Sequence, residues 1–294
     1  MVTETVPKPK ALWAALSVLP LPGADGWQGD MARVISRVEQ EASALASGGV
    51  DGIVLDNRLD APFGKGRMEQ AGAIALADLT RRIRALTGLP VGITVYRNDV
   101  ETALGIALNA EADFVRVPLL VGAMIEETGV VEGALQALTA FRRRIRGTAG
   151  IPLWVDVSIH HVLSQPFAPG ESPVAHLAAL IRTIEAYDIA AGLILTADNH
   201  TTPPVVLALK DQHITDLPMI IAIRADRPEA GAHYAVGDGL LLAGGLEKST
   251  RFEPGLPPAV DMVKTEETVS RLKKIKSVDQ IDPDFFLSQM YQGR

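Results

Sequence analysis

The most constraining feature of this sequence is a repeated alternation between short apolar runs and longer amphipathic segments. The apolar runs are rich in Val, Ile and Leu with little polar interruption, which is typical of strands buried on both faces of a parallel sheet. Eight such runs occur, at residues 12–18, 52–56, 90–96, 113–117, 151–157, 191–196, 218–223 and 237–243.

The segments between these runs have helical spacing. In residues 31–47, for example, Ile35, Val38, Ala42 and Leu45 fall on one stripe. The other predicted helices cover residues 68–86, 99–110, 132–146, 173–187, 203–213 and 257–274, and the seventh unit is the weakest because residues 226–234 offer barely two turns. This order predicts an α/β fold, a (β/α)8 TIM barrel. A doubly wound open sheet is the rival, but the first turn, SVLPLPGADG, does not match its G-x-G-x-x-G pattern.

We expect one barrel domain over residues 1–276 and a C-terminal extension over residues 277–294. The extension carries Phe285, Phe286, Leu287 and Met290 among acidic residues. A helix that packs on the outside of the barrel or on a neighbouring subunit is the expected arrangement, and a lid is the alternative. The sequence is compatible with a homo-oligomer.

Composition narrows the class of protein. The chain has no cysteine, which excludes disulfides and thiolate metal sites and fits a reducing cytoplasm. Its formal net charge of −7 disfavours non-specific binding to nucleic acid or anionic membranes. No apolar stretch approaches the length of a membrane span, and no signal peptide is evident. We therefore expect a cytoplasmic protein with a small-molecule ligand, without nucleic acid or a membrane span.

Polar side chains follow five successive predicted strands. In a TIM barrel the strand C-termini and the loops after them build the active site, so we expect these side chains to converge on one pocket. In strand order they are Asp56, Asn57 and Asp60; Arg97, Asn98 and Asp99; Arg116; Asp156, His160 and His161; and Thr196, Asp198, Asn199 and His200.

This set is suited to acid–base chemistry. His161 has a reference pKa of about 6.5 and can hold or release a proton near neutral pH. Asp156 or Asp56 can orient it or act as base, and Arg97 and Arg116 can bind a carboxylate or phosphate. We predict Asp156, His161 and Asp56 as catalytic residues and Asn57, Asp60, Arg97, Asn98, Arg116, Thr196 and Asn199 as substrate-binding residues.

Several of these residues also have a purely structural interpretation. Asp99 can serve only as a helix N-cap. Arg116 lies within an apolar strand, so a buried ion pair with Asp56 or Asp156 would account for it. His160 and His161 are adjacent and cannot both point inward on a regular strand.

Metal and phosphate sites are weaker predictions. Asp56, Asp60, Asp156 and His161 are compatible with a divalent cation, although HxH and HExxH spacings are absent, and no cofactor motif occurs. After the eighth strand, Gly244 and Gly245 free backbone amides and Lys248 adds charge, which predicts half of a phosphate site. The turn after the seventh strand, AIRADRPEAG, is not glycine-rich.

The segments PLPG, GGVDGIVLDNRLDAPF, VYRNDVETAL, ADFVRVPLLVGAMIEETGVVEG, VDVSIHHV and DGLLLAGGLEK resemble, in order, the BtpA/SgcQ family of ribulose-phosphate-binding-type barrels. The resemblance spans residues 19–263. It implies a TIM barrel and functions named as photosystem I biogenesis for one member and sugar metabolism for others. Carried over by position, it supports Asn57, Asp60, Phe63, Arg97, Asn98, Asp99, Arg116, Asp156 and His161.

The sequence departs from the family pattern in ways that imply altered specificity. Asp56 stands where the family usually has Glu, His160 stands where it has Lys, and IRADRP replaces a Gly-Ser-Gly turn. From the acid–base residues and the family resemblance together, we predict an enzyme, of lyase, isomerase or hydrolase type, that acts on a sugar- or sugar-phosphate-like molecule. The alternative is a non-catalytic biogenesis or assembly factor.

Overall fold

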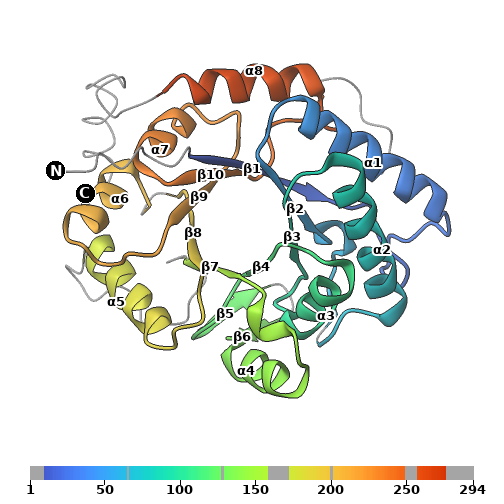
Figure 1. Cartoon of the computed structure of the whole chain (residues 1–294), viewed down its shortest axis with the longest axis horizontal. Coiled ribbons are helices and arrows are strands. Elements are labelled where there is room, and N and C mark those ends of the chain that lie inside the picture. Colours follow the sequence, from blue (N-terminus) through green and yellow to red (C-terminus); the bar gives the residue numbers. More distant parts are fainter. Residues whose placement is uncertain are drawn as a thin grey trace.

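The computed structural model describes residues 10–64, 66–126, 129–157, 172–198, 201–248 and 257–275. Eight parallel strands close into a barrel in the order β1-β2-β3-β4-β7-β8-β9-β10, with helices around the outside (Figure 1). The TIM-barrel prediction is confirmed, and each predicted strand is present. The barrel strands are β1 Ala11–Ser17, β2 Gly52–Asp56, β3 Val91–Thr94, β4 Phe114–Val117, β7 Leu153–Val157, β8 Gly192–Thr196, β9 Met219–Ile223 and β10 Gly239–Leu242.

The helices begin where the sequence provides caps. Asp30, Asp99, Ser172 and Asp261 each accept a hydrogen bond from a backbone N–H in the first turn of the helix that follows. The expected weak seventh unit contains the short helix α7. The helices are α1 Met31–Ser47, α2 Gln70–Thr87, α3 Val100–Ala110, α4 Leu135–Arg144, α5 Pro173–Glu185, α6 Pro203–Asp211, α7 Ala230–Val236 and α8 Met262–Lys273, with 3-10 turns η1 Arg58–Asp60 and η2 Thr148–Gly150.

Three aromatic rings fill the barrel near the amino-terminal ends of its strands. Trp13 stacks on Phe114 with ring centroids 4.5 Å apart and meets Trp154 edge-on at 4.8 Å. Glycines on neighbouring strands make room for them: a Cβ on Gly92 would lie 2.1 Å from Phe114, and one on Gly192 would lie 2.3 Å from Trp154. The rings therefore fill the barrel interior at this end.

Above the aromatic rings, the interior of the barrel becomes polar. Strand side chains alternate between the two faces, so a residue two positions beyond an inward-facing apolar residue also faces inward. The apolar interior cluster contains Val54, Phe114, Trp154, Ile194 and Ala222. Two residues further along each strand or its end stand Asp56, Arg116, Asp156, Thr196 and Arg224. The sequence thus builds a polar layer at the carboxyl ends of the strands.

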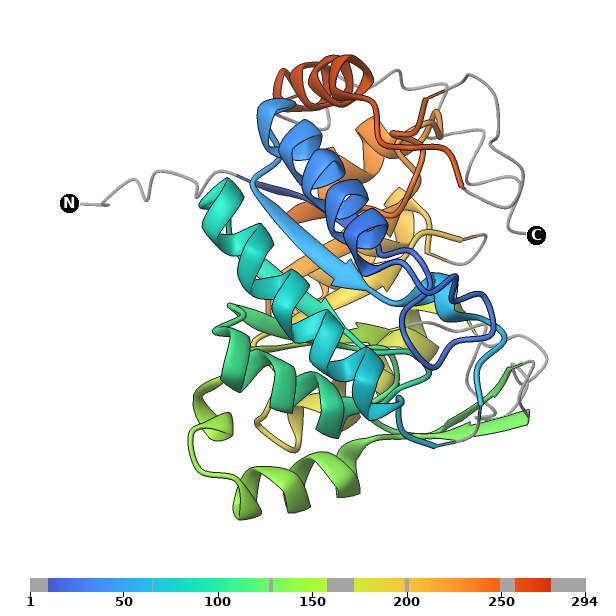
Figure 2. The same ribbon diagram turned by 90° about the vertical axis from the view of Figure 1, so that its right-hand side faces the viewer.

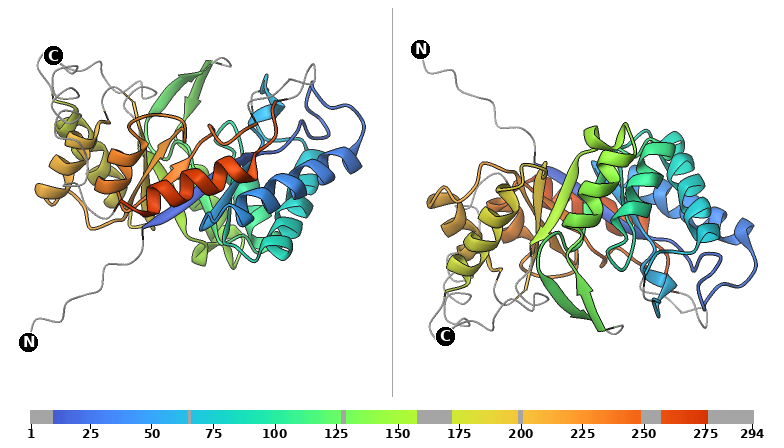
Figure 3. Two further views of the ribbon diagram at one scale, coloured as in Figure 1. Left: turned by 90° about the horizontal axis from the view of Figure 1, so that it is seen from above. Right: turned by 90° about the horizontal axis from the view of Figure 1, so that it is seen from below.

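One element was not expected. An antiparallel hairpin, β5 Ala123–Glu126 and β6 Gly129–Glu132, is inserted between β4 and α4. The helix expected from residue 132 therefore begins only at Leu135. The hairpin projects from the side of the barrel toward which the strands run (Figures 2 and 3). It therefore stands beside the polar end of the barrel.

Among the described residues, no helix combines the length and the apolar character that crossing a bilayer requires. The predicted C-terminal extension, residues 277–294, lies outside the described residues.

Candidate functional site

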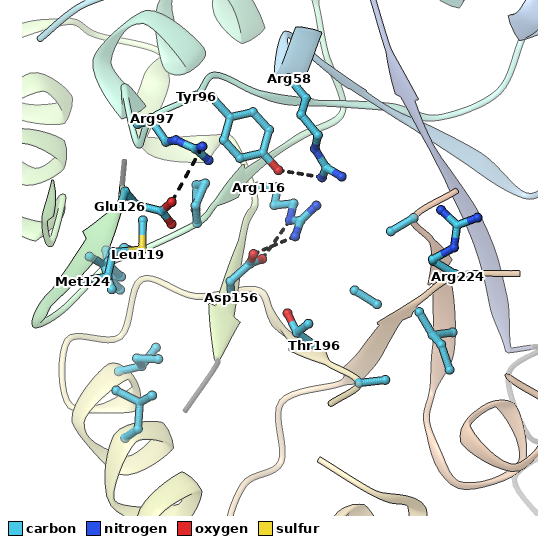
Figure 4. Close-up of a pocket in the computed structure, with 18 of the residues that line it drawn as sticks. Arg58, Tyr96, Arg97, Arg116, Leu119, Met124, Glu126, Asp156, Thr196 and Arg224 are labelled. Atoms are coloured by element: carbon cyan, nitrogen blue, oxygen red, sulfur yellow. Dashed lines mark hydrogen bonds and ion pairs between the residues drawn. The ribbon is translucent and has the colours of Figure 1, made fainter. Parts of the chain in front are cut away.

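A cavity of about 810 Å³ opens at the carboxyl ends of the barrel strands (Figure 4). Its lining contains five arginines against three carboxylates, so positive charge is in excess. Apolar side chains also line the cavity, among them Leu119, Met124, Leu180, Ile184 and Ile223. The polar lining consists of Arg58, Arg97, Arg116, Arg224, Arg227, Glu126, Asp156, Asp226, Tyr96 and Thr196.

A buried ion pair forms the floor of this cavity. Arg116 donates from Nε and Nη2 to the two carboxylate oxygens of Asp156, at 2.8 and 2.7 Å. The third guanidinium nitrogen, Nη1, is buried and has no hydrogen-bond partner among the residues that the structure describes. Burial lowers the pKa of Arg116. Asp156, together with Tyr96 and Asp56, raises it by more than burial lowers it, so the net shift is upward. Arg116 is therefore a permanent cation at the floor.

The sequence left two partners open for Arg116, and the structure pairs it with Asp156. Both oxygens of that carboxylate accept from the guanidinium, so in this arrangement Asp156 acts as a counter-ion. This pairing is the structural alternative that the sequence allowed for this strand.

Asp56 lies beneath the cavity and does not line it. Its side chain is fully buried at the end of β2, and Oδ1 accepts a hydrogen bond from the backbone N–H of Arg58 at 3.0 Å. Its Oδ2 lies 3.9 Å from Nη2 of Arg58 and has no hydrogen-bond partner in the described part of the chain. Asp56 thus supports the turn that carries Arg58.

Asn57 and Asp60 hold the loops around the cavity together. Asn57 accepts from the backbone N–H of Tyr96 at 2.8 Å and donates to Asp60 at 3.0 Å. Asp60 also accepts from the backbone N–H of Leu21 at 2.8 Å. Burial raises the pKa of Asp60, and these two hydrogen bonds oppose that shift. Both residues line a separate pocket of about 290 Å³ between the loops after β1 and β2, not the large cavity.

Arg58 after β2 and Tyr96 after β3 line the cavity but were not predicted from the sequence. Arg58 donates from Nη2 to the hydroxyl of Tyr96 at 2.8 Å, and its guanidinium lies 5.4 Å from the centre of that ring. Its side chain is 46% exposed. Signals for both were present: Arg58 stands inside the segment LDNRLD, and Tyr96 stands two positions after the inward-facing Thr94.

Of the residues after β3, Arg97 lines the cavity as predicted. Its guanidinium lies 3.7 Å from Oε2 of Glu126 on the hairpin and 4.8 Å from the centre of the Phe63 ring. Asn98 instead fixes the inserted segment, because it donates to the carbonyls of Leu119 and Glu132 at 2.8 and 3.0 Å.

Asp99 is a helix N-cap, as one interpretation of the sequence allowed. It accepts from the backbone N–H groups of Thr102 and Met68 at 3.1 and 2.9 Å. The carboxylate thereby joins the start of α3 to the loop before α2. Asp99 does not line the large cavity.

The far side of the cavity is formed by Thr196 at the end of β8 and by the turn after β9. Thr196 lines the cavity as predicted. Arg224 was not predicted; it pairs with Asp226 through two hydrogen bonds of 3.1 and 2.8 Å. The sequence signal for Arg224 is its position, two residues after the inward-facing Ala222.

The predicted phosphate turn after β10 holds a carboxylate of the chain itself. Gly244 and Gly245 have positive φ angles of 103° and 86°, as a glycine turn requires. However, the N–H of Gly245 donates to Glu247 at 2.9 Å, and Lys248 is exposed and does not line the large cavity. A phosphate would have to displace Glu247, so the structure gives no support to this site.

The catalytic proton carrier predicted from the sequence cannot be placed. His161, its neighbour His160, and Asn199 lie outside the described residues, so their roles stay predictions. Among the described residues, no group of three or more His, Asp or Glu side chains is arranged to hold a metal ion. Asp60 and Asp156, two of the proposed metal ligands, instead make the contacts described above.

Comparison with known proteins agrees with the sequence motifs. A sequence model of the BtpA family matches residues 8–274. The chain belongs to the BtpA family. It is 34% identical over 243 residues to the photosystem I biogenesis protein BtpA of Synechocystis sp., which covers 82% of each chain. It is 25% identical over 269 residues to an uncharacterised protein of Pyrococcus horikoshii, which covers 92% of this chain and 97% of the relative.

Two solved structures with folds similar to this member of the BtpA family are those of enzymes. 7,8-Dihydropteroate synthase from Vibrio fischeri superposes with a TM-score of 0.56 at 13% identity, covering 94% of this chain and 95% of the other. N-(5'-phosphoribosyl)anthranilate isomerase from Pyrococcus furiosus gives a TM-score of 0.50 at 13% identity, covering 90% and 100%. At such low identity these likenesses show the shared fold alone.

Proposed function

We propose that this BtpA-family barrel is an enzyme that binds a small anionic polar molecule, of the sugar or sugar-phosphate type, and converts it by acid–base chemistry. The observation that carries this proposal is the cavity of about 810 Å³ at the strand C-termini, lined by five arginines and three carboxylates. That volume suits a small-molecule ligand, and this end of a TIM barrel is where active sites occur.

The lining supports separate roles for binding and for proton transfer. Asp156 stabilises the charged form of Arg116 and leaves Nη1 without a hydrogen-bond partner among the described residues, which supports a role of Arg116 in attracting an anion to the floor. The hydroxyl of Tyr96 can donate or accept a proton, and Arg58 fixes its position through a 2.8 Å hydrogen bond. His161 follows the last residue of β7, Val157, by four positions in the sequence, and we assign it the role of second proton carrier that the sequence predicted.

The test begins with ligand discovery. The full chain is screened by thermal shift against sugar phosphates, neutral sugars and small carboxylates, with and without divalent cations, and each hit is followed for chemical conversion by NMR. For a hit that is converted, Tyr96→Phe and His161→Ala are each expected to lower kcat by about 100-fold or more.

Leu108→Ala, on the outer face of α3, is the matched control and is expected to leave kcat unchanged. If both Tyr96→Phe and His161→Ala convert every hit at the wild-type rate, the acid–base mechanism is wrong.

An assembly role is the second candidate, and the name of the Synechocystis relative favours it. This role predicts a stable protein partner whose binding does not need the cavity. Affinity purification of the full chain, of a chain ending at residue 276 and of Tyr96→Phe separates the two proposals. A partner lost only on truncation supports assembly, whereas turnover abolished by Tyr96→Phe supports the enzyme.

A further inference from the structure

Arg58, at the β2–β4 side of the cavity, differs from Arg116 and Arg224 in its hydrogen-bond partner. Arg116 makes two hydrogen bonds to Asp156, and Arg224 makes two to Asp226. Arg58, in contrast, donates its hydrogen bond to the hydroxyl of Tyr96. The carboxylate oxygen nearest to Arg58, Oδ2 of Asp56, is buried and 3.9 Å away, beyond hydrogen-bond distance.

Arg116 lies next to Arg58. It donates hydrogen bonds from Nε and Nη2 to Asp156, while Nη1 is buried without a hydrogen-bond partner in the described part of the chain. Figure 4 shows its guanidinium between Asp156 and Arg58. Burial lowers the pKa of Arg58, Tyr96 and Asp56 raise it, Arg116 opposes them through repulsion, and the net shift is upward. Arg58 therefore stays a cation, and it lies close enough to Arg116 for the two guanidinium groups to repel each other.

An oxyanion is the ligand group that such an arrangement would stabilise. It would relieve the repulsion between Arg58 and Arg116 and accept charge-assisted hydrogen bonds from the exposed Arg58 guanidinium. The turn after β10 offers no comparable site, because Glu247 already accepts from the N–H of Gly245. Charge and geometry thus favour the β2–β4 side over the glycine turn.

We propose that a carboxylate or phosphate group of the ligand binds between Arg58 and Arg116, at the β2–β4 side of the cavity. This inference rests on the proposed function, since it assigns the anionic end of the same ligand. Arg58 makes the direct contacts, and Arg116 supplies a second positive charge from the floor. Asp56 is a positioning residue, because it holds the backbone N–H of Arg58 at 3.0 Å.

The test measures anion binding without any assumption about turnover. Inorganic phosphate and malonate are titrated into the full chain by calorimetry at constant ionic strength, so that one arm probes phosphate and the other carboxylate. Arg58→Gln is the main variant. Its side chain is 46% exposed, so the fold is expected to persist, and a thermal melt checks this.

Two control variants are measured beside Arg58→Gln. Arg81→Gln removes an exposed arginine on α2 whose side chain is 62% exposed and which does not line the cavity. Glu247→Gln removes the carboxylate from the Gly245 amide and would strengthen binding if the anion belonged at the glycine turn.

We expect wild type, Arg81→Gln and Glu247→Gln to bind at least one of the two anions with affinities within about twofold of one another. Arg58→Gln is expected to weaken that binding at least about tenfold, the effect of one charged hydrogen bond. The proposal is overturned if wild type binds neither anion, if Arg58→Gln binds normally, or if Glu247→Gln alone strengthens binding.

The two proposals fail in different ways. Anion binding through Arg58 without conversion of any ligand would reject the enzyme and keep the anion site. Conversion of a substrate with the same KM in wild type and Arg58→Gln would keep the enzyme and reject the anion site.

Discussion

Arg116 and Asp156 form a bidentate ion pair across neighbouring strands β4 and β7, with N–O distances of 2.8 and 2.7 Å. The pair sits above the apolar interior of the barrel and forms the floor of the cavity. Asp156 occupies Nε and Nη2 of Arg116, whereas Nη1 is buried without a hydrogen-bond partner among the described residues. In the proposed anion site, this guanidinium supplies positive charge beside Arg58.

Removing one partner of the Arg116–Asp156 pair should lower the stability of the fold. Asp156→Ala leaves Arg116, which is 7% exposed, without its counter-ion, so we expect the free energy of unfolding to fall by about 3–5 kcal/mol. Urea denaturation measures the loss. Asp226→Ala breaks the surface pair with Arg224 and should cost no more than about 1 kcal/mol. Equal losses in the two variants would show that the buried pair contributes no more than the exposed one.

Alanine substitutions of two glycines, one packed against an aromatic ring and one in open space, should change stability in opposite directions. Gly92→Ala places a Cβ 2.1 Å from Phe114, and we expect it to destabilise the barrel by about 1–3 kcal/mol or more. Gly105→Ala, on α3, meets nothing within 4 Å and should stabilise by about 0.5–1 kcal/mol because alanine favours a helix. Thermal unfolding of both variants gives the signs. Phe114→Leu should restore part of the stability of Gly92→Ala, and absence of rescue would locate the strain elsewhere.

Asn98 should control the order of the inserted segment. Its amide and carbonyl groups make three hydrogen bonds, to Leu119 N–H, Leu119 O and Glu132 O, so Asn98→Ala should cost about 1–3 kcal/mol. Hydrogen exchange is expected to rise in residues 119–134. Because Asn98 has a φ of 66°, Asn98→Gly relaxes the backbone while removing the same bonds. If glycine left exchange at the wild-type level, backbone conformation and not hydrogen bonding would be the cause.

Glu41, on α1, predicts a pH-dependent contribution to stability. Burial raises its pKa, while Arg37 and the N–H of Val260 oppose the shift and Glu247 adds to it. The folded chain therefore binds this proton at a higher pH than the unfolded chain does. The contribution of Glu41 to stability is then full below the unfolded pKa of about 4.3 and is lost as pH rises through the folded value.

Urea unfolding of wild type and Glu41→Gln between pH 4 and pH 7 tests this sign. Wild type should lose stability relative to Glu41→Gln as the pH rises, because glutamine does not titrate. Glu39→Gln, at a partly exposed position on the same helix, is the matched control substitution. A wild type that gained stability over Glu41→Gln toward pH 7 would show that Arg37 outweighs burial.

The sequence alone determined the barrel. Apolar runs such as residues 52–56 and 218–223 can be buried on both faces only inside a layer of helices, and eight of them in alternation leave few other folds. The polar layer was determined in the same way. Side-chain alternation along a strand is fixed, so Arg116 and Asp156 had to share the interior with Phe114 and Trp154 two positions earlier.

Tertiary structure decided what lies beyond the strand ends, where no periodicity constrains a side chain. There Asn57 accepts a hydrogen bond from the backbone N–H of Tyr96, whereas Arg58, the next residue, lines the cavity. Likewise, Glu247 accepts a hydrogen bond from the N–H of Gly245. The choice of Asp156 over Asp56 as partner of Arg116 depended on the distances between three strands. Those distances are set only once the barrel has closed, so the sequence predicts which charged residues face the interior but not which of them form ion pairs.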